Sequence, residues 1–315
     1  MMHGVRIFTG DNNGIIPHLP SESVHCVVTS PPYWGQRDYG AAGQTGNEVT
    51  PEDYIEALVR LFTKVRRVLR ADGTLWLNLG DKYRDKELLG LPWRVALALQ
   101  ADGWRLRSEL IWHKPKAMTS SALDRPVCSH EHLFLLTKSE EYFYDHYAVR
   151  TPASEPGKDR ALRSVWTIPV ARETESHFAA YPEDFVKPCI LAGTSAHGVC
   201  AVCGAPYWLD LEAVRMPTRP GSTSKVTGNS DVDGNRDKGR HITEYKPLGW
   251  RRACSCHAEE ILPAVVLDPY GGTGTTAAVA VKLGRRAILC ELNPEYVEIQ
   301  KRKIVKAAQN KGFGI

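Results

Sequence analysis

The stretch that decides the fold is AVVLDPYGGTGTT, at residues 264–276. Its apolar start predicts a buried strand from Ala264 to Leu267, and a helical pattern follows from Thr275 to Leu283. Glycines in the turn between them let the backbone N–H groups of the helix start approach a ligand closely. The turn lacks the lysine that ends a phosphate-binding loop, which argues against a kinase or ATPase. The stretch therefore predicts a site for a nucleotide-like cofactor.

A second carboxylate supports this prediction. The next predicted strand runs from Arg286 to Glu291, and a final helix from Pro294 to about Ala308. Glu291 follows Asp268 by about twenty residues, the place where dinucleotide-binding folds hold a pair of ribose hydroxyls. The two acids are therefore expected side by side at neighbouring strand ends.

Strands and helices alternate along the rest of the chain, which predicts a doubly wound α/β sheet. The clearest helix is Thr50 to Leu69, because apolar residues recur at the helical period behind an N-cap threonine and Pro51. A second helix opens near Pro92. The other predicted strands are Val5–Phe8, Val24–Thr29, Thr74–Asn78, Trp104–Trp112 and His132–Thr137.

The strand at 24–29 ends in an unusual rigid turn, Ser30-Pro31-Pro32-Tyr33. Prolines fix φ and have no N–H, so the turn offers oxygen acceptors with few competing donors. An exocyclic amino group on a nucleobase is a poor nucleophile because its lone pair is delocalised. Accepting its N–H bonds at Ser30 Oγ and the Pro31 carbonyl would localise that lone pair, while Tyr33 stacks on the extruded base. The turn thus predicts methylation of an amino group on a base.

With both motifs, the sequence resembles the amino-group DNA methyltransferases of the permuted β type, in which the Pro-Pro-Tyr motif precedes the glycine motif. The resemblance covers nearly the whole chain. It rests on Gly10-Asp11, Thr29 to Trp34, Leu77-Asn78-Leu79-Gly80-Asp81, Ile111 to Pro115, Ser164 to Ile168, His177-Phe178, Gly193, Asp268 to Thr276 and Glu291-Leu292-Asn293-Pro294.

The resemblance implies a circularly permuted, Rossmann-like sheet of seven strands, to which residues 5–8 supply the strand that normally follows Glu291. The chain termini should then lie on the same side of the sheet. It also implies S-adenosylmethionine as the cofactor and double-stranded DNA as the substrate. The catalytic residues it implies are Ser30, Pro31, Pro32 and Tyr33. The cofactor-binding residues it implies are Asp11, Thr29, Phe178, Asp268, Pro269, Gly271, Gly272, Gly274, Thr275, Glu291 and Asn293.

The target base is left open between cytosine and adenine. Ser30, where many adenine-specific members carry Asp, resembles the members that make N4-methylcytosine, which we therefore expect; N6-adenine methylation is the alternative. Trp34 either narrows the base pocket in favour of a pyrimidine or faces the core. Cytosine C5 methylation would need a cysteine nucleophile. Pro188-Cys189 has that composition, but it falls in a helix-like stretch and is expected to be a buried core cysteine.

Four of the eight cysteines form two short-spaced pairs, Cys200/Cys203 and Cys254/Cys256. Four thiolates suit a tetrahedral structural zinc in a zinc knuckle, although His257 could replace one cysteine of the second pair. The alternative is a set of reduced, unliganded thiols. The remaining cysteines, at 26, 128, 189 and 290, are expected in the core.

A basic segment lies between the cysteine pairs. Residues 211–252 hold nine Lys or Arg against five Asp or Glu, which predicts a mobile phosphate-binding loop that zinc tethers on the DNA side. We assign residues 1–193 and 258–315 to the catalytic domain and 194–257 to a zinc-binding insertion. Target recognition is expected at about 116–165, where Arg125, Arg160 and Arg163 could contact guanine.

The overall composition fits a folded enzyme with nucleic acid as its partner but does not demonstrate it, since the net charge is only +4 and the pI about 8.5. We expect neither a signal peptide nor a membrane span, and so a cytoplasmic protein, monomeric or homodimeric. The family resemblance implies a prokaryotic or phage source. Two alternatives remain: an RNA or small-molecule methyltransferase, and a zinc-dependent DNA-binding module without catalysis.

Overall fold

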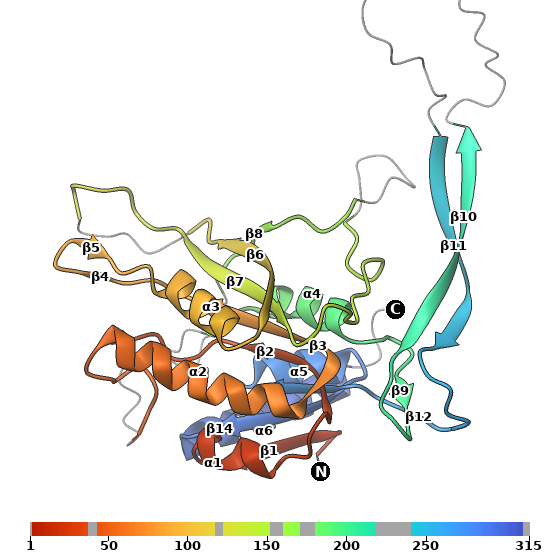
Figure 1. The fold of residues 1–315 in the computed structure, drawn as a ribbon, viewed down its shortest axis with the longest axis horizontal. Helices are drawn as coiled ribbons and strands as arrows, with labels where there is room; N and C mark the ends of the chain where they lie inside the picture. The colour runs from red at the N-terminus through yellow and green to blue at the C-terminus, as the bar shows by residue number, and fades with distance from the viewer. Residues whose placement is uncertain are drawn as a thin grey trace, which may run out of the picture.

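The computed structural model describes residues 2–36, 43–116, 122–151, 160–170, 180–217 and 241–310. Its centre is a sheet in the order β1-β14-β13-β2-β3-β7-β6-β8 (Figure 1). The first five strands in this order run parallel, and β7 runs antiparallel between β3 and β6. The strands are β1 (Val5–Thr9), β14 (Arg286–Glu291), β13 (Val265–Asp268), β2 (Val24–Thr29), β3 (Leu69–Leu79), β7 (His130–Thr137), β6 (Arg105–His113) and β8 (Val165–Thr167).

Helices cover both faces of the sheet and create two separate cores. On one face α2 (Pro51–Val68) and α3 (Leu91–Ala101) pack with η1 (Ile16–His18). On the other face lie α4 (Glu183–Gly193), α5 (Thr275–Lys282) and α6 (Pro294–Gln309). Successive residues of β2 serve opposite cores, Val27 the first and Val28 the second, as strand geometry requires. Among the described residues no helix is both long and apolar enough to cross a membrane.

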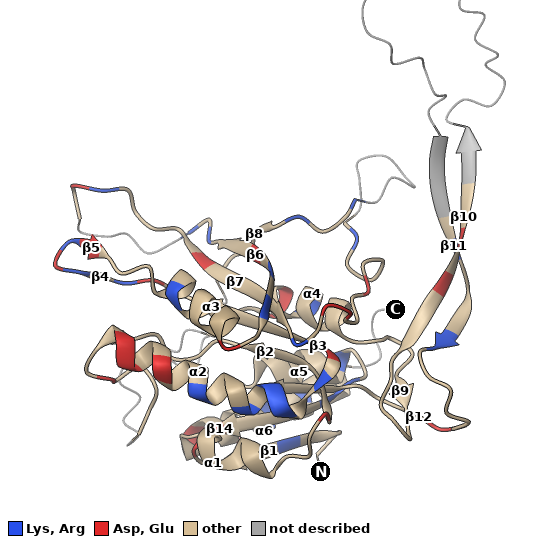
Figure 2. Ribbon diagram, viewed as in Figure 1, with Lys and Arg blue, Asp and Glu red and all other residues tan. Residues whose placement is uncertain are grey.

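Helix α2 has the ends that its sequence predicts. Thr50 Oγ1 accepts the Asp53 N–H at 3.1 Å, and Pro51 occupies the first turn. Acidic residues lie in the first turn and basic residues in the last, and charges in these positions interact favourably with the helix dipole (Figure 2). The predicted doubly wound α/β class is confirmed, with a mostly parallel sheet.

The sheet has eight strands where seven were expected. The additional strand is β8, three residues long, which pairs in parallel with the edge strand β6. Its Trp166 is buried, and Trp112 Nε1 donates to the Ile168 carbonyl at 2.8 Å. Both tryptophan rings pack on Phe185 of α4, so this contact and the hydrogen bond fix the short segment against β6. At the opposite edge β1 pairs with β14, from Val5 opposite Ala287 to Thr9 opposite Glu291.

The expectation of a loop at 211–252 is wrong for the described part of that segment. Strands β10 (Tyr207–Pro217) and β11 (His241–Arg252) form an antiparallel ribbon, here called the arm, that extends from the body (Figure 1). The short run Leu209 to Ala213 alternates between apolar and acidic residues, which suits a strand, but the basic composition of the surrounding segment favoured a loop. Most of the predicted basic loop, at 218–240, lies outside the described residues.

Short elements complete the structure. Helix α1 (Asn12–Ile15) follows β1, and a small hairpin, β4 (Tyr83–Arg84) with β5 (Glu87–Leu88), follows β3. Strand β9 (Val199–Cys200) pairs antiparallel with β12 (Ile261–Leu262), at the foot of the arm. The carboxyl ends of β2, β13 and β14 meet at one edge of the sheet, where ligands bind in open α/β folds.

Candidate active site

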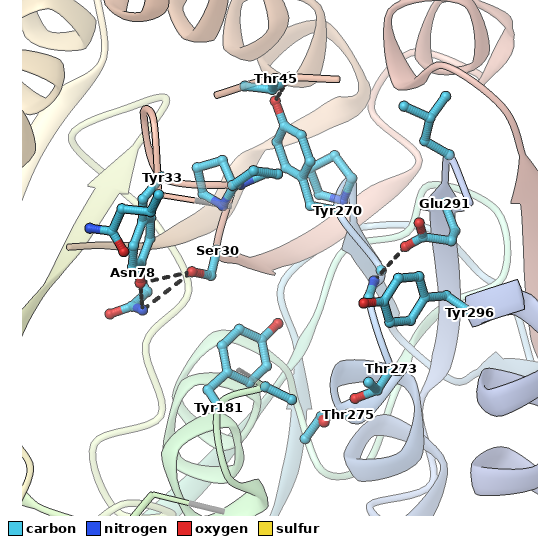
Figure 3. A pocket seen from close by; sticks show the side chains of 18 of the residues that line it. Ser30, Tyr33, Thr45, Asn78, Tyr181, Tyr270, Thr273, Thr275, Glu291 and Tyr296 are labelled. Atoms are coloured by element: carbon cyan, nitrogen blue, oxygen red, sulfur yellow. Dashed lines mark hydrogen bonds between the residues drawn. The ribbon is translucent and has the colours of Figure 1, made fainter. Parts of the chain in front are cut away.

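A cavity of about 630 Å³ opens at this edge, within the usual range of about 300–1,000 Å³ for ligand pockets (Figure 3). Both motifs of the sequence contribute to its wall. The predicted site residues that line it are Asp11, Ser30, Pro31, Pro32, Tyr33, Pro269, Gly271, Gly272, Thr275, Glu291 and Asn293.

Three predicted cofactor residues lie behind this wall instead of lining it: Thr29, Asp268 and Gly274. Asp268 is 1% exposed. Its Oδ1 accepts the hydroxyl of Thr29 at 2.7 Å, and its Oδ2 accepts that of Tyr181 at 2.8 Å. Burial raises the pKa of Asp268 to about 6 against the lowering effect of these hydrogen bonds. Asp268 therefore joins β13 to β2 and to Tyr181. Phe178 lies outside the described residues.

The glycine turn is tightly packed. Gly274, at φ +82°, is the N-cap of α5 in the left-handed region, and a Cβ there would lie 3.0 Å from Gln300 Cγ. A Cβ on Gly271 would lie 2.9 Å from Gln300 Nε2. Gln300 in turn donates to the Gly272 carbonyl at 2.8 Å. Close packing against α6 thus fixes the backbone that faces the cavity.

Glu291 ends β14 beside this turn. Its carboxylate accepts the backbone N–H of Gly272 at 2.7 Å and that of Asn293 at 2.9 Å. Burial raises the pKa of Glu291 to about 7. Tyr270 and Tyr296 also line this part of the cavity. The arrangement offers a carboxylate for a pair of hydroxyls beside flat apolar surfaces, as an adenosine requires.

On the other side of the cavity, Ser30 belongs to a network of polar side chains. Ser30 Oγ donates to Tyr33 OH at 3.1 Å, and Tyr33 OH donates to Glu131 Oε2 at 2.7 Å. Asn78 Nδ2 donates to Tyr33 OH at 2.8 Å and to Ser30 Oγ at 3.3 Å (Figure 3). Burial raises the pKa of Tyr33 well above its usual value, so the phenol stays protonated.

Two members of this network and one of its neighbours had no role assigned from the sequence. Asn78, from β3, and Lys114, after β6, were quoted in motifs without a function, while Glu131 on β7 was not singled out. Lys114 Nζ forms an ion pair with Glu131 and lies 4.3 Å from the centre of the Trp112 ring. These residues are close only because β3, β7 and β6 are neighbours in the sheet, which no local pattern reveals.

Neighbouring residues hold the turn from Ser30 to Tyr33 in position. The hydroxyl of Tyr54, on α2, donates to the Pro32 carbonyl at 3.0 Å. A Cβ on Gly80 would lie 2.5 Å from the Tyr33 ring, so glycine makes room for that ring. Trp34 is buried in the core, with Nε1 donating to the Glu48 carbonyl at 2.8 Å. Of its two expected roles, the core one is therefore correct.

The isolated cysteines also differ from one another. Cys189 is buried in α4, and its thiol donates to the Phe185 carbonyl, so the expectation of a core residue is confirmed. Cys26 and Cys290 are buried as well. Cys128 is exposed and lines the cavity, so its assignment to the core is wrong: it lies in the loop before β7, outside the sheet.

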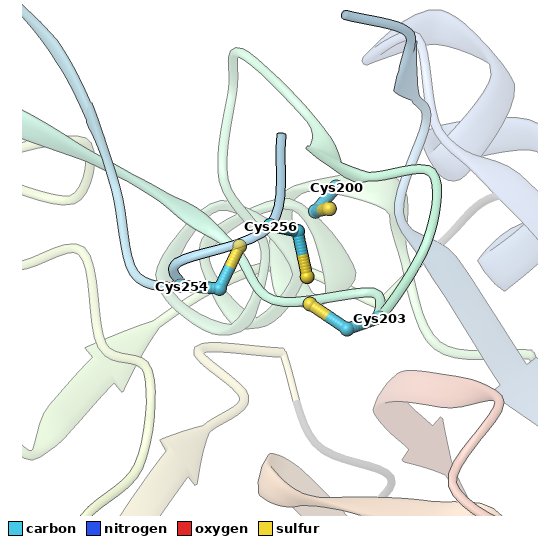
Figure 4. A group of neighbouring side chains, drawn as sticks. All are labelled: Cys200, Cys203, Cys254 and Cys256. Atoms are coloured by element: carbon cyan, nitrogen blue, oxygen red, sulfur yellow. The ribbon is translucent and has the colours of Figure 1, made fainter. Parts of the chain in front are cut away.

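The paired cysteines come together near the amino ends of the strands. Their Sγ atoms all lie within 4.8 Å of one another (Figure 4). Gly204, which follows Cys203, contacts His25 near the start of β2, whereas Ser30 follows the end of the same strand. The cluster and the cavity therefore lie at opposite ends of β2, so the expectation of a tether on the cavity side is wrong for the foot of the arm.

The three arginines considered for base recognition all lie among the described residues. The Arg125 guanidinium lies 3.6 Å from the centre of the Tyr83 ring, beside an open second hollow lined by Lys86 and Leu123. Arg160 pairs through its backbone with Thr151. The Arg163 carbonyl accepts from Trp166. Their contact with DNA stays a prediction.

Comparison with known proteins identifies close relatives. The family model described as DNA methylase matches residues 24–201 and 225–302. Type II methyltransferase M.SmaI of Serratia marcescens is 35% identical over 335 residues, covering 97% of this chain and 92% of that protein. M.XycI of Xanthomonas campestris pv. cyanopsidis is 37% identical over 328 residues, covering 95% and 87%. The gap in the family match falls inside the segment predicted as an insertion.

Solved structures share the fold. PvuII DNA methyltransferase, described as cytosine-N4-specific, superposes with a TM-score of 0.64 at 16% identity, covering 99% of this chain and 93% of that one. M1.HpyAVI in complex with S-adenosylmethionine gives a TM-score of 0.53 at 14% identity, covering 95% and 98%. At such identities the likeness is one of fold.

Proposed function

Because this chain belongs to the DNA methylase family and is an S-adenosylmethionine-dependent DNA amino-methyltransferase, we propose that its target is the N4 amino group of a cytosine flipped out of duplex DNA. The observation that carries the proposal is the position of Ser30 Oγ. It lies in the same cavity as Glu291, hydrogen-bonded to Tyr33 and Asn78.

The cavity fits the cofactor. Glu291 and the glycine turn would hold the adenosine, with Asp11 near the adenine. When bound, S-adenosylmethionine supplies a methyl group activated by its sulfonium. Thr29 and Tyr181 would act on the site through Asp268, whose carboxylate they fix. Behind the wall, the hydrogen bond of 2.7 Å from Thr29 to Asp268 joins the strand that precedes Ser30 to the strand that precedes the glycine turn. Both motifs line one cavity, so the base and the cofactor would meet there.

Ser30 and Pro31 would orient the amino group. A base stacked on Tyr33 presents its amino hydrogens to Ser30 Oγ and the Pro31 carbonyl, which localises the nitrogen lone pair towards the methyl group. Tyr54 and Gly80 hold the turn and the stacking ring in place. The chain would thus act by positioning and by accepting hydrogen bonds.

The preference for cytosine rests on the residue type at position 30, where Ser resembles the members that make N4-methylcytosine, and the chemistry of serine is compatible with it. A serine hydroxyl accepts a hydrogen bond without placing a second negative charge in the buried network that already contains Glu131. The cytosine-N4-specific PvuII enzyme, which shares the fold, supports the same choice. N6-adenine methylation remains the competing function, because Ser30 can accept from either amino group.

Analysis of the methylated product tests the proposal. Duplex DNA modified by the purified protein is digested to nucleosides, which are separated and identified by mass. We expect N4-methyl-2′-deoxycytidine as the main product, at one sequence motif. N6-methyl-2′-deoxyadenosine alone would overturn the choice of base while preserving amino methylation.

A further inference from the structure

The cysteine cluster at the foot of the arm forms a second site, separate from the catalytic cavity. Four Sγ atoms lie within 4.8 Å of one another, and they come from two turns about fifty residues apart in the sequence. Zinc–sulfur bonds of about 2.3 Å in a tetrahedron place the sulfurs about 3.8 Å apart. The four side chains are therefore already close to the positions that a tetrahedral ion requires.

The backbone of the first turn suits metal-binding cysteines. The Gly204 N–H donates to the Cys200 carbonyl at 2.8 Å, and the Cys200 N–H donates to the Ala205 carbonyl at 2.9 Å. Gly204 has φ +72°, in the left-handed region. The tight turn directs both thiols of the Cys-x-x-Cys pair to the same side, and Ile261 on β12 pairs with Cys200 from the opposite strand.

Contacts with the body hold the first turn and a contact with the arm holds the second, all through backbone oxygens, which leaves the sulfurs available. Arg70, which is ion-paired with Asp72, donates to the Cys203 carbonyl at 2.6 Å. His25 lies within 3.0 Å of the Gly204 carbonyl, and its other ring nitrogen accepts the Val265 N–H at 3.1 Å. Arg252, in β11, donates to the Cys256 carbonyl at 2.9 Å.

We propose that Cys200, Cys203, Cys254 and Cys256 bind one structural Zn²⁺ that fixes the foot of the arm. Four thiolates fill a tetrahedral ion and leave no open position, so the metal takes no part in methyl transfer. A two-stranded ribbon is at best marginally stable alone. The ion joins the end of β9 and the turn after it to the residues that follow β11, and so links the two ends of the arm.

Metal analysis tests this site. Protein purified without chelators should contain one zinc per chain, and cobalt exchanged for it should show the intense visible absorption of a tetrahedral thiolate site. Cys203→Ser should lose the metal, whereas Cys128→Ser, at an exposed cysteine outside the cluster, should keep it. Substoichiometric zinc, or peptide mass analysis that finds these four cysteines in disulfides, would overturn the proposal.

Removal of the metal from the folded wild-type protein tests the structural role of zinc without a substitution that could itself cause misfolding. A mercurial reagent displaces zinc by binding the thiolates, a chelator captures the zinc, and excess small thiol then removes the mercury from the cysteines. Limited proteolysis of this metal-free protein should cut the arm faster, and readdition of zinc should restore protection. S-adenosylmethionine affinity should not change, because the cavity lies at the other end of β2. An arm that stays equally resistant without metal would contradict the structural role.

The hydrogen-bonded network beside Ser30 carries a second, independent inference, which rests on the proposed function. When the amino nitrogen forms its bond to the methyl carbon, the sulfur–carbon bond breaks and its electron pair stays on sulfur. The nitrogen then carries one proton too many. Of the described carboxylates that line the cavity, Asp11 and Glu291 lie on the cofactor side, and Glu131 alone connects to Ser30 by hydrogen bonds.

We infer that Glu131 accepts this proton through Ser30 and Tyr33. The amino proton moves to Ser30 Oγ, the Ser30 proton to Tyr33 OH, and the Tyr33 proton to the Glu131 carboxylate. Each oxygen already donates to the next, at 3.1 Å and 2.7 Å. Asn78 Nδ2, 2.8 Å from both Tyr33 OH and Glu131 Oε2, aligns the chain, and Lys114 balances the charge of Glu131. Glu131 is thus a positioning residue that acts through Tyr33.

A double-mutant cycle tests the relay under single-turnover conditions. Tyr33→Phe keeps the stacking ring, Glu131→Gln keeps the shape, and each should slow methyl transfer about 10²-fold, within the range for general acid–base catalysis. The double variant should be no slower than either single variant, because each substitution alone already interrupts the same proton relay. Glu131→Asp should recover part of the rate, and the wild-type solvent deuterium isotope effect should vanish in both single variants.

Glu109→Gln is the matched control. Glu109 lies on β6, accepts from His132 at 2.7 Å and does not line the cavity, so its loss should leave the rate and the isotope effect unchanged. Additive losses in the cycle, or a wild-type rate in Glu131→Gln, would overturn the relay while leaving the proposed function intact. A wild-type protein that modifies no cytosine would count against the proposed function instead.

Discussion

Side chains on the two sides of the cavity have different roles: those on one side would hold the cofactor, and those on the other would orient the base. Ser30 belongs to the second group. We expect Ser30→Ala to bind S-adenosylmethionine normally but to lose about 10²- to 10³-fold in turnover, the usual effect of one transition-state hydrogen bond. Calorimetry and single-turnover kinetics measure the two quantities separately. Ser23→Ala, before the start of β2, is the control, and near-normal turnover of Ser30→Ala would contradict the acceptor role.

Glu291 makes cofactor binding depend on pH. Its pKa, raised by burial to about 7, places its titration near neutrality. Ribose hydroxyls are donors and bind the ionised carboxylate better, so affinity should fall as the pH drops through 7, by up to about tenfold per unit below the pKa. Titration calorimetry across this range measures the profile. Glu291→Gln should bind more weakly and flatten it; an unchanged profile would exclude Glu291 as its source.

Ser30 and Glu291 could be predicted from the sequence, since Ser30 follows a recognisable strand, Glu291 ends another, and both lie in the expected cavity. Asn78, Glu131 and Lys114 could not be predicted. Their roles depend on which strands are neighbours and on the antiparallel direction of β7, which places the start of that strand beside the ends of the others. Such proximity is a property of topology.

At the scale of elements, the packing of α4 against the sheet depends on a missing side chain. A Cβ on Gly193, the last residue of α4, would lie 2.5 Å from Thr74 Oγ1 and 2.8 Å from Cys26 Sγ. We expect Gly193→Ala to lower the free energy of unfolding by about 1–3 kcal/mol, because overpacking outweighs the gain of about 1 kcal/mol in helix propensity. Urea denaturation measures the change.

Gly14→Ala is the control for this substitution. Gly14 lies in α1 and has no atom within 4 Å of an added Cβ, so the free energy of unfolding should stay equal or rise slightly. If Gly193→Ala is as stable as Gly14→Ala, α4 shifts at little cost and the sheet does not require glycine at position 193.

Elements with strong periodicity were predictable and the arm was not. Helix α2 has an apolar stripe, an N-cap and opposite charges at its two ends, all of which indicate the same structure. The arm has an alternating strand, but the basic composition of its neighbourhood suggested a loop. Strand β8 is only three residues long, and its place depends on tertiary contact between Trp166 and β6.

At the scale of the whole molecule, the edge position of β1 permits a test of the permuted order. Residues 1–20 would be moved behind Ile315 through a Gly/Ser linker, so that the chain starts at the exposed Ser21. Strand β1 can then still pair with β14, and the Gly10 N–H can still donate to the Glu291 carbonyl. We expect a folded protein with wild-type cofactor affinity, measured by circular dichroism and calorimetry. An unfolded chain would show that folding requires residues 1–20 at the amino terminus.

The pairing of β9 with β12 sets the insertion apart from the rest of the chain. Val199 and Cys200 lie opposite Leu262 and Ile261, so the polypeptide leaves the catalytic body and returns to it at adjacent points. The entropy of closing a loop grows only slowly with its length. The length of chain between these two short strands can therefore change at little cost in closure entropy, provided that the turn at Cys203 and Gly204 keeps its contacts with Arg70 and His25.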